Sequence, residues 1–162
     1  MRRTLFRIFG RLPKPVRRFL IRRAAPTWTA GAVAILERDD GRWLMVSPVY
    51  RKGWSLPGGL IDRGEDPAAA VVREFSEELG LDIAVTGDPW IVYDSKMRRV
   101  DAIFRAELVR PVDLDTISVQ PPELDGVGWF DPAAPPTIEE EAEDVLALLR
   151  DVEAGGTTIR WR

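Results

Sequence analysis

The chain has 162 residues, 45% of them hydrophobic and 30% charged, a composition typical of a soluble globular protein with one domain. It contains neither cysteine nor histidine, so disulfides, thiolate metal sites, a cysteine nucleophile and the commonest general base are excluded. Any acid–base or metal chemistry must therefore use carboxylates, which favours hard cations such as Mg²⁺ or Mn²⁺.

The net charge of −3 hides an uneven distribution. Residues 1–36 hold nine of the 23 Lys and Arg and no Asp or Glu, which leaves 14 basic against 26 acidic residues in the rest of the chain. Arginines interrupt the first apolar groups, which argues against a signal peptide, and no run approaches the roughly 20 apolar residues of a membrane span. We expect a cytoplasmic protein with a basic N-terminal arm at residues 1–26.

The arm is predicted to be helical, with breaks at Pro13 and Pro15. In its segment VRRFLIRR (16–23), apolar side chains would share one helical face with arginines around it. Docking of this face on its own domain, or across a homodimer, is the favoured interpretation. Contact with an anionic membrane surface or with RNA phosphates is the alternative.

Beyond the arm, apolar runs separated by turn signals predict strands at 27–36, 42–50, 54–59, 89–95, 98–108 and 126–130. Helical patterns occur at 67–79 and 138–153. The turn signal DDG at 39–41 predicts that 42–50 returns along 27–36 as a hairpin. These elements predict an α/β domain at 27–153, with helices packed on a mixed sheet, followed by a C-terminal tail at 154–162.

The helix at 67–79 has the clearest boundaries. Asp66 suits the N-cap, Pro67 suits the first helical position, and Gly80 suits the C-terminal end. One apolar stripe of this helix is expected to face the core, and its members are Val72, Phe75 and Leu79.

A neighbouring stripe of the same helix carries three carboxylates, Glu74, Glu77 and Glu78. Like charges at these spacings cost a helix a few tenths of a kcal/mol each, roughly, so their clustering favours a bound cation. The preceding loop contains Gly58 and Gly59, which can bring backbone close to a ligand. A solvated surface face is the alternative interpretation of the three glutamates.

The whole segment resembles the Nudix box, G-x5-E-x7-R-E-U-x-E-E-x-G-U, in which U is a bulky apolar residue. The matching positions are Gly59, Glu65, Arg73, Glu74, Phe75, Glu77, Glu78, Gly80 and Leu81. The resemblance implies a Nudix-type α/β/α sandwich with a mixed central sheet and helices on both faces. It also implies a Mg²⁺-dependent hydrolase, with Mn²⁺ as the alternative metal. Its substrate would be a small nucleotide in which a nucleoside diphosphate is linked to another group.

The resemblance also implies roles for particular residues. Glu77 and Glu78 would be the main metal ligands, with the Gly58 carbonyl as a further ligand. Glu74 would bind the metal through water or act as general base. Arg73 would orient Glu74, and Glu65 would brace the loop by hydrogen bonds.

Glu123 is a candidate outside the box. It stands six residues before Trp129, a spacing found in family members whose extra metal-binding glutamate comes from this loop. It would complete the metal shell or take the proton from the attacking water, and a solvated loop carboxylate is the alternative. The other acidic candidates are weaker, namely Asp101, Glu107 and Asp125.

A second function class is a non-catalytic Nudix-fold binding or sensor module whose basic arm engages membrane or nucleic acid. The intact set of glutamates argues against it. Nucleotide sugars, dinucleotides and nucleoside triphosphates remain open as substrates, because residues 96–99 show neither the proline nor the tyrosine that marks two of the family's substrate groups.

Overall fold

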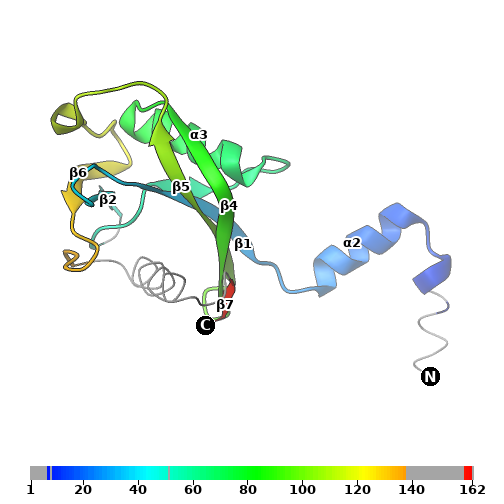
Figure 1. Ribbon diagram of the computed structural model, residues 1–162. Helices are drawn as coiled ribbons and strands as arrows, with labels where there is room; N and C mark the ends of the chain where they lie inside the picture. The colour runs from blue at the N-terminus through cyan, green and yellow to red at the C-terminus, as the bar shows by residue number, and fades with distance from the viewer. Residues whose placement is uncertain (1–6, 8, 51, 138–158, 162) are drawn as a thin grey trace.

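The computed structural model describes residues 7, 9–50, 52–137 and 159–161. Within these residues, the body is a five-stranded sheet, a separate two-stranded sheet and one helix packed on the larger sheet (Figure 1). The larger sheet has the order β3-β1-β5-β4-β7 and consists of β1 (Thr29–Leu36), β3 (Gly58–Leu60), β4 (Ile83–Asp94), β5 (Arg99–Leu108) and β7 (Ile159–Trp161). The smaller sheet joins β2 (Trp43–Pro48) to β6 (Leu124–Phe130), and a short 3-10 helix, η1, spans Leu114–Thr116.

The larger sheet is mixed, as predicted. Strand β1 is parallel to β5 and antiparallel to β3, and β4 is antiparallel to β5 and parallel to β7. The predicted hairpin of 27–36 with 42–50 is wrong, because β1 already has β3 and β5 on its two sides. Strand β2 instead pairs with β6 and meets the end of β1 only at the bridge between Glu37 and Trp43.

Helix α3 (Pro67–Leu79) has the predicted boundaries. The Asp66 side chain accepts a hydrogen bond from the Ala68 amide at 2.9 Å, and Gly80 adopts the left-handed conformation with φ +66°. Its core face runs along Val71, Phe75 and Leu79, which are 0, 0 and 5% exposed. Val72, predicted to face the core, is 36% exposed, because Val71 and not Val72 lies on the buried face together with Phe75 and Leu79.

These buried side chains fix the helix on one face of the sheet. Each fully buried large apolar side chain contributes about 1.5–3 kcal/mol, so this face supplies most of the helix's attachment. The carboxylate stripe is therefore held at a defined position beside β3. The helix expected at 138–153 lies outside the described residues.

Helix α2 (Lys14–Ala24) belongs to the basic arm and projects away from the body (Figure 1). None of its residues is buried, and Val16, Phe19 and Leu20 are 40, 62 and 41% exposed. The expected docking on its own domain is therefore not made with the described part of the body. Within the described residues, no helix is long and apolar enough to cross a membrane.

The expected C-terminal tail contains an element that the sequence did not reveal. Residues 159–161 form β7, which adds to the edge of β4.

Candidate active site

The glycine pair at the start of β3 brings backbone close to two different neighbours. Gly58 has φ +139°, and a Cβ atom there would lie 2.7 Å from the Val33 Cα on β1. A Cβ on Gly59 would lie 2.7 Å from the Glu74 carboxyl carbon on α3. Glycine at both positions thus lets β3 run against β1 while the Glu74 carboxylate lies on the β3 backbone.

Arg73 links the loop to the glutamate stripe. Its Nε donates to Glu65 Oε1 at 2.9 Å, and its Nη1 donates to Glu74 Oε1 at 2.9 Å and to Glu77 Oε2 at 3.1 Å. Its Nη2 donates to the Leu60 carbonyl at 3.3 Å and to Glu65 Oε2 at 3.2 Å. Such charge-assisted bonds are stronger than neutral ones, so Arg73 holds Glu74 in one orientation.

Glu65 braces the loop between β3 and α3. Its Oε2 accepts a hydrogen bond from the Asp62 amide at 2.8 Å, and its side chain is 17% exposed. The Arg73 hydrogen bond, followed by that backbone bond, lowers the pKa of Glu65. Glu65 is therefore an ionised partner of Arg73, in the geometry expected for a bracing role.

Glu78 is the carboxylate of the site whose negative charge is least compensated by its surroundings. Burial, followed by the negative charges of Glu74 and Glu123, raises its pKa to about 7. The Gly58 amide donates a hydrogen bond to its carboxylate, but its Oε2 is buried and has no hydrogen-bond partner within the described structure. A buried carboxylate oxygen in this state needs a proton or a cation.

Glu74 shares this environment. Burial raises its pKa, against the opposing effect of the Arg73 hydrogen bond, and the charges of Glu77 and Glu123 raise it further. The structure thus gives Glu74 one oxygen bonded to arginine inside a cluster of like charges.

Glu77 and Glu123 lie at the rim. Glu77 has a 61% exposed side chain turned toward Arg73. Glu123 precedes β6 and is exposed, and its carbonyl accepts a hydrogen bond from the Val49 amide at 3.0 Å. Since its charge acts on both Glu74 and Glu78, the fold brings it to the box glutamates, although it is 45 residues beyond Glu78 in the chain.

The donor set fits a hard divalent cation. Carboxylate and carbonyl oxygens are the ligands that Mg²⁺ takes in proteins, and the Glu78 Oε2 atom lacks the partner that such an ion supplies. Among the described residues, no three acidic side chains already converge on one coordination point. In this arrangement Arg73 bonds one oxygen of Glu74 and one of Glu77.

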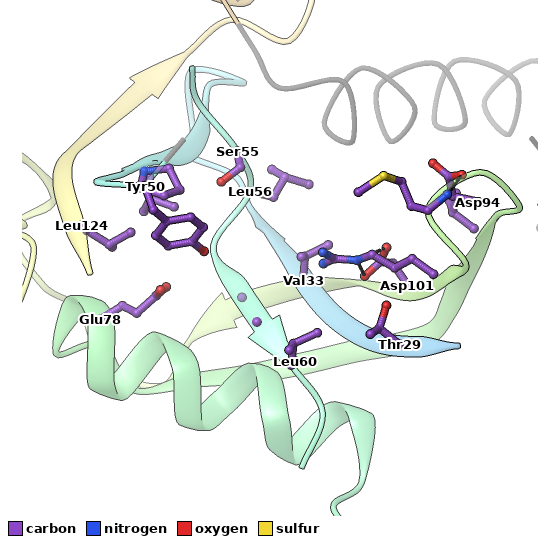
Figure 2. A pocket seen from close by; sticks show the side chains of 17 residues that line it. Thr29, Val33, Tyr50, Ser55, Leu56, Leu60, Glu78, Asp94, Asp101 and Leu124 are labelled. Atoms are coloured by element: carbon purple, nitrogen blue, oxygen red, sulfur yellow. Dashed lines mark hydrogen bonds and ion pairs between the residues drawn. The ribbon is translucent and has the colours of Figure 1, made fainter. Parts of the chain in front are cut away.

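A cavity of about 460 Å³ adjoins the glutamates. Figure 2 shows Glu78 extending toward the side of the cavity where Tyr50 and Leu124 lie. Gly58 and Gly59 line the same cavity, which continues past β3 to Asp94 and Asp101 (Figure 2). The glutamate cluster therefore stands at one end of a ligand-sized pocket.

Sequence reasoning named Asp101 only as a weak acidic candidate and did not predict the pocket's other end. Arg99 and Asp101 line it as an ion pair, with Nε 2.8 Å from Oδ2, and their side chains are 15 and 16% exposed. Opposite charges two residues apart on one face of a predicted strand were the available signal. Their burial could not be inferred without the neighbouring strand.

The fold and the site together form a mixed-sheet domain whose helix presents glutamates to a pocket. The family model described as the NUDIX domain matches residues 27–149. The chain therefore belongs to the NUDIX family, and this membership, together with relatives named RNA pyrophosphohydrolase, supports the prediction of a Nudix-type pyrophosphohydrolase.

Similar proteins agree with this placement. A MutT-like protein of Streptomyces ambofaciens is 28% identical over 141 residues, covering 83% of this chain and 84% of that protein. An RNA pyrophosphohydrolase of Acidiphilium cryptum (strain JF-5) is 40% identical over 68 residues, which cover only 40% of this chain and 38% of that enzyme.

Solved structures confirm the fold class. An ADP-ribose pyrophosphatase from Streptococcus suis 89-1591 has a TM-score of 0.62 at 24% identity, covering 84% of this chain and all of that one (100%). A MutT NUDIX hydrolase from Burkholderia pseudomallei has a TM-score of 0.60 at 26% identity, covering 75% and 98% of the two chains.

Proposed function

We propose that the protein is a Mg²⁺-dependent hydrolase that cleaves the diphosphate linkage of a nucleoside diphosphate joined to another group. The products would be a nucleoside monophosphate and the phosphorylated remainder. The observation that carries this proposal is Glu78, a partly buried carboxylate whose Oε2 is buried without a hydrogen-bond partner, at the wall of a pocket large enough for a nucleoside. Mn²⁺ is the alternative metal.

The protein's own residues have distinct tasks in this reaction. Glu77, Glu78 and the Gly58 carbonyl would hold the ion, which screens the diphosphate charge and lowers the pKa of a bound water. Glu74 is positioned by Arg73 through Oε1, so its other oxygen can accept the proton of the attacking water. Glu123 is the alternative base, because it lies within electrostatic reach of Glu74 and Glu78.

The reaction needs no reagent other than water. A water oxygen forms a bond to one phosphorus atom, and the bond between that phosphorus and the bridging oxygen breaks. The bridging oxygen leaves with the bonding pair on the second phosphate, and the proton of the water passes to the base.

The substrate is proposed as a small molecule: a nucleotide sugar, a dinucleotide or a nucleoside triphosphate. The names of similar proteins differ in substrate, since they include an ADP-ribose pyrophosphatase, a UDP-X diphosphatase and RNA pyrophosphohydrolases. The cavity of about 460 Å³ suits a nucleoside with its linked phosphates better than a polymer.

The test is phosphate release across these substrates, with Mg²⁺ and with EDTA, for the natural protein and the Glu78→Gln variant. We expect turnover only with the metal and a loss of at least about a hundredfold in kcat for the variant. Glu107→Gln is the matched control, because Glu107 is exposed on β5 and does not line the cavity. Equal turnover with EDTA, or by Glu78→Gln, would refute the proposal.

A binding or sensor module is the second candidate, and the exposed basic helix α2 favours it. Saturable nucleotide binding without any turnover would support that function. Turnover that requires Glu78 would exclude it as the main function.

A further inference from the structure

The cavity reaches two chemically different places. At one end are Glu78 and the glycine pair, and at the other are Arg99 and Asp101. Figure 2 shows Glu78 on one side of β3, and Asp101, with Thr29 near it, on the other. A substrate with its diphosphate at the glutamates can thus extend past β3 to the Arg99–Asp101 pair.

The pair is built into the sheet. Arg99 Nε donates to Asp101 Oδ1 at 2.9 Å and to Oδ2 at 2.8 Å. In the parallel register of β1 and β5, Gly31 lies beside Asp101. A Cβ atom on Gly31 would lie 2.9 Å from Arg99 Nη2 and closer still to Asp101 Oδ1. The pair therefore occupies space that exists only because β1 has glycine there.

Stability alone is a poor explanation for this arrangement. A largely buried ion pair has to overcome the desolvation of both charges, and a well-packed apolar pair of similar volume is often as stable or more so. The surrounding cavity wall is mostly apolar, with Val33, Leu56 and Leu60 among its side chains. A few polar groups set among apolar walls are the usual means by which a pocket orients its ligand.

The apolar walls also restrict which part of a nucleotide belongs here. A sugar carries hydroxyls around its whole ring, and an apolar wall would leave several of them buried without partners. A nucleobase has two apolar faces, and its polar groups are confined to the rim of the ring. The chemistry of this end therefore fits a base, with its edge directed at the ion pair.

We propose that Asp101 and Arg99 read the nucleobase: the Asp101 carboxylate accepts a hydrogen bond from the exocyclic amino group, and the Arg99 guanidinium donates to the adjacent ring nitrogen or carbonyl. A carboxylate accepts at about four lone-pair positions and a guanidinium carries five N–H donors, so each can bond its partner and a ligand together. This inference rests on the proposed function, which places a nucleotide in the cavity.

The consequence is a preference for bases that carry an amino group. Cytosine should bind better than uracil, and guanine better than hypoxanthine, because the second member of each comparison lacks the amino group. Matched side-chain contacts to a base edge discriminate against the wrong base by about tenfold or more. We expect a ratio of at least about ten in each comparison.

The experiment measures binding of nucleoside monophosphates in EDTA, so that it does not depend on hydrolysis. CMP is compared with UMP and GMP with IMP, by titration calorimetry, for the natural protein, Asp101→Asn and Glu37→Gln. Glu37 is the matched control. It forms an ion pair at 3.0 Å with Arg105, which lies on β5 like Asp101, but it does not line the cavity. Asp101→Asn should reduce both ratios to about threefold or less, because a carboxamide both donates and accepts, and Glu37→Gln should leave them unchanged.

Several results would overturn the inference: equal binding of both members by the natural protein, no binding of any of the four, or unchanged ratios in Asp101→Asn. If circular dichroism shows that Asp101→Asn does not fold, the ratios of the natural protein and of Arg99→Lys decide. Arg99→Lys keeps the charge and should keep the amino preference with weaker binding.

Measurements on the natural protein distinguish a failure of this inference from a failure of the proposed function. A base preference in binding, with no diphosphate hydrolysed, would refute the reaction and leave base reading in place. Hydrolysis at equal kcat/KM for CTP and UTP, and for GTP and ITP, would support the reaction and refute base reading.

Discussion

Glu78 makes a measurable prediction about the stability of the metal-free protein. Its pKa is raised from 4.5 to about 7 in the folded state, mainly by burial. The folded state binds this proton more tightly than the unfolded state, so ionisation of Glu78 destabilises the folded protein. This destabilisation is absent below about pH 4.5, grows as pH rises from there, and is complete above about pH 7. Stability in EDTA should therefore fall across this range.

The magnitude follows from the shift. At about 1.4 kcal/mol per pKa unit, the full change would be about 3 kcal/mol. Glu78 is only partly buried, so solvent screening reduces this to roughly 1–2 kcal/mol. For a chain of this size, that corresponds to a shift in Tm of about 2–8 °C.

The assay is thermal unfolding in EDTA at pH 5 to pH 8 for the natural protein and Glu78→Gln. The amide cannot ionise, so the Tm of the variant should exceed that of the natural protein by an amount that grows with pH. Saturating Mg²⁺ should remove the advantage, because a ligand bound only by the folded state stabilises it by mass action. A Tm difference that stays constant from pH 5 to pH 8 would refute the assignment of Glu78 as the unbalanced charge.

Three further predictions concern the loop, the rim and the arm. Gly59→Ala should lower kcat at least about tenfold, because the added Cβ would lie 2.7 Å from the Glu74 carboxyl carbon and displace it; unchanged kcat would contradict the role of that contact. Glu123→Gln should lower kcat about a hundredfold with little change in Tm, as expected for a general base or metal ligand that makes no packing contacts. A drop in Tm with unchanged kcat would show a structural role instead. Deletion of residues 1–26 should leave the Tm of the domain within a few degrees, because α2 buries none of its residues. The deletion should also abolish either dimerisation, measured by light scattering, or binding to anionic vesicles or RNA at low salt; loss of none of these would refute both roles of the arm.

The catalytic segment could be predicted from sequence because its information is local. Asp66 and Gly80 set the ends of α3 through contacts with their own neighbours, and both ends were placed correctly. Arg73, Glu74 and Glu77 are close in space because they are close on one helix. The error at Val72 has the same local origin: a helical wheel gives the spacing of a stripe, but tertiary packing decides which stripe faces the sheet.

Strand partners are not local, and they were predicted less well. The turn at 39–41 is a valid turn signal, yet β2 leaves β1 for β6, because a strand has only two edges and β3 and β5 occupy those of β1. A turn signal specifies that the chain reverses, and it says nothing of competition for an edge.

The same distinction separates the two ends of the pocket. Apart from Glu123, the glutamates at one end are encoded in one continuous segment, so they can be recognised in a single sequence. The Arg99–Asp101 end exists only when the parallel register brings Gly31 beside Asp101, 70 residues apart, and leaves room for the pair above the sheet. Substitutions in β1 or β5 can therefore alter base preference without touching the residues that break the diphosphate bond. If both proposals hold, the reaction and the choice of base are determined by different parts of the chain.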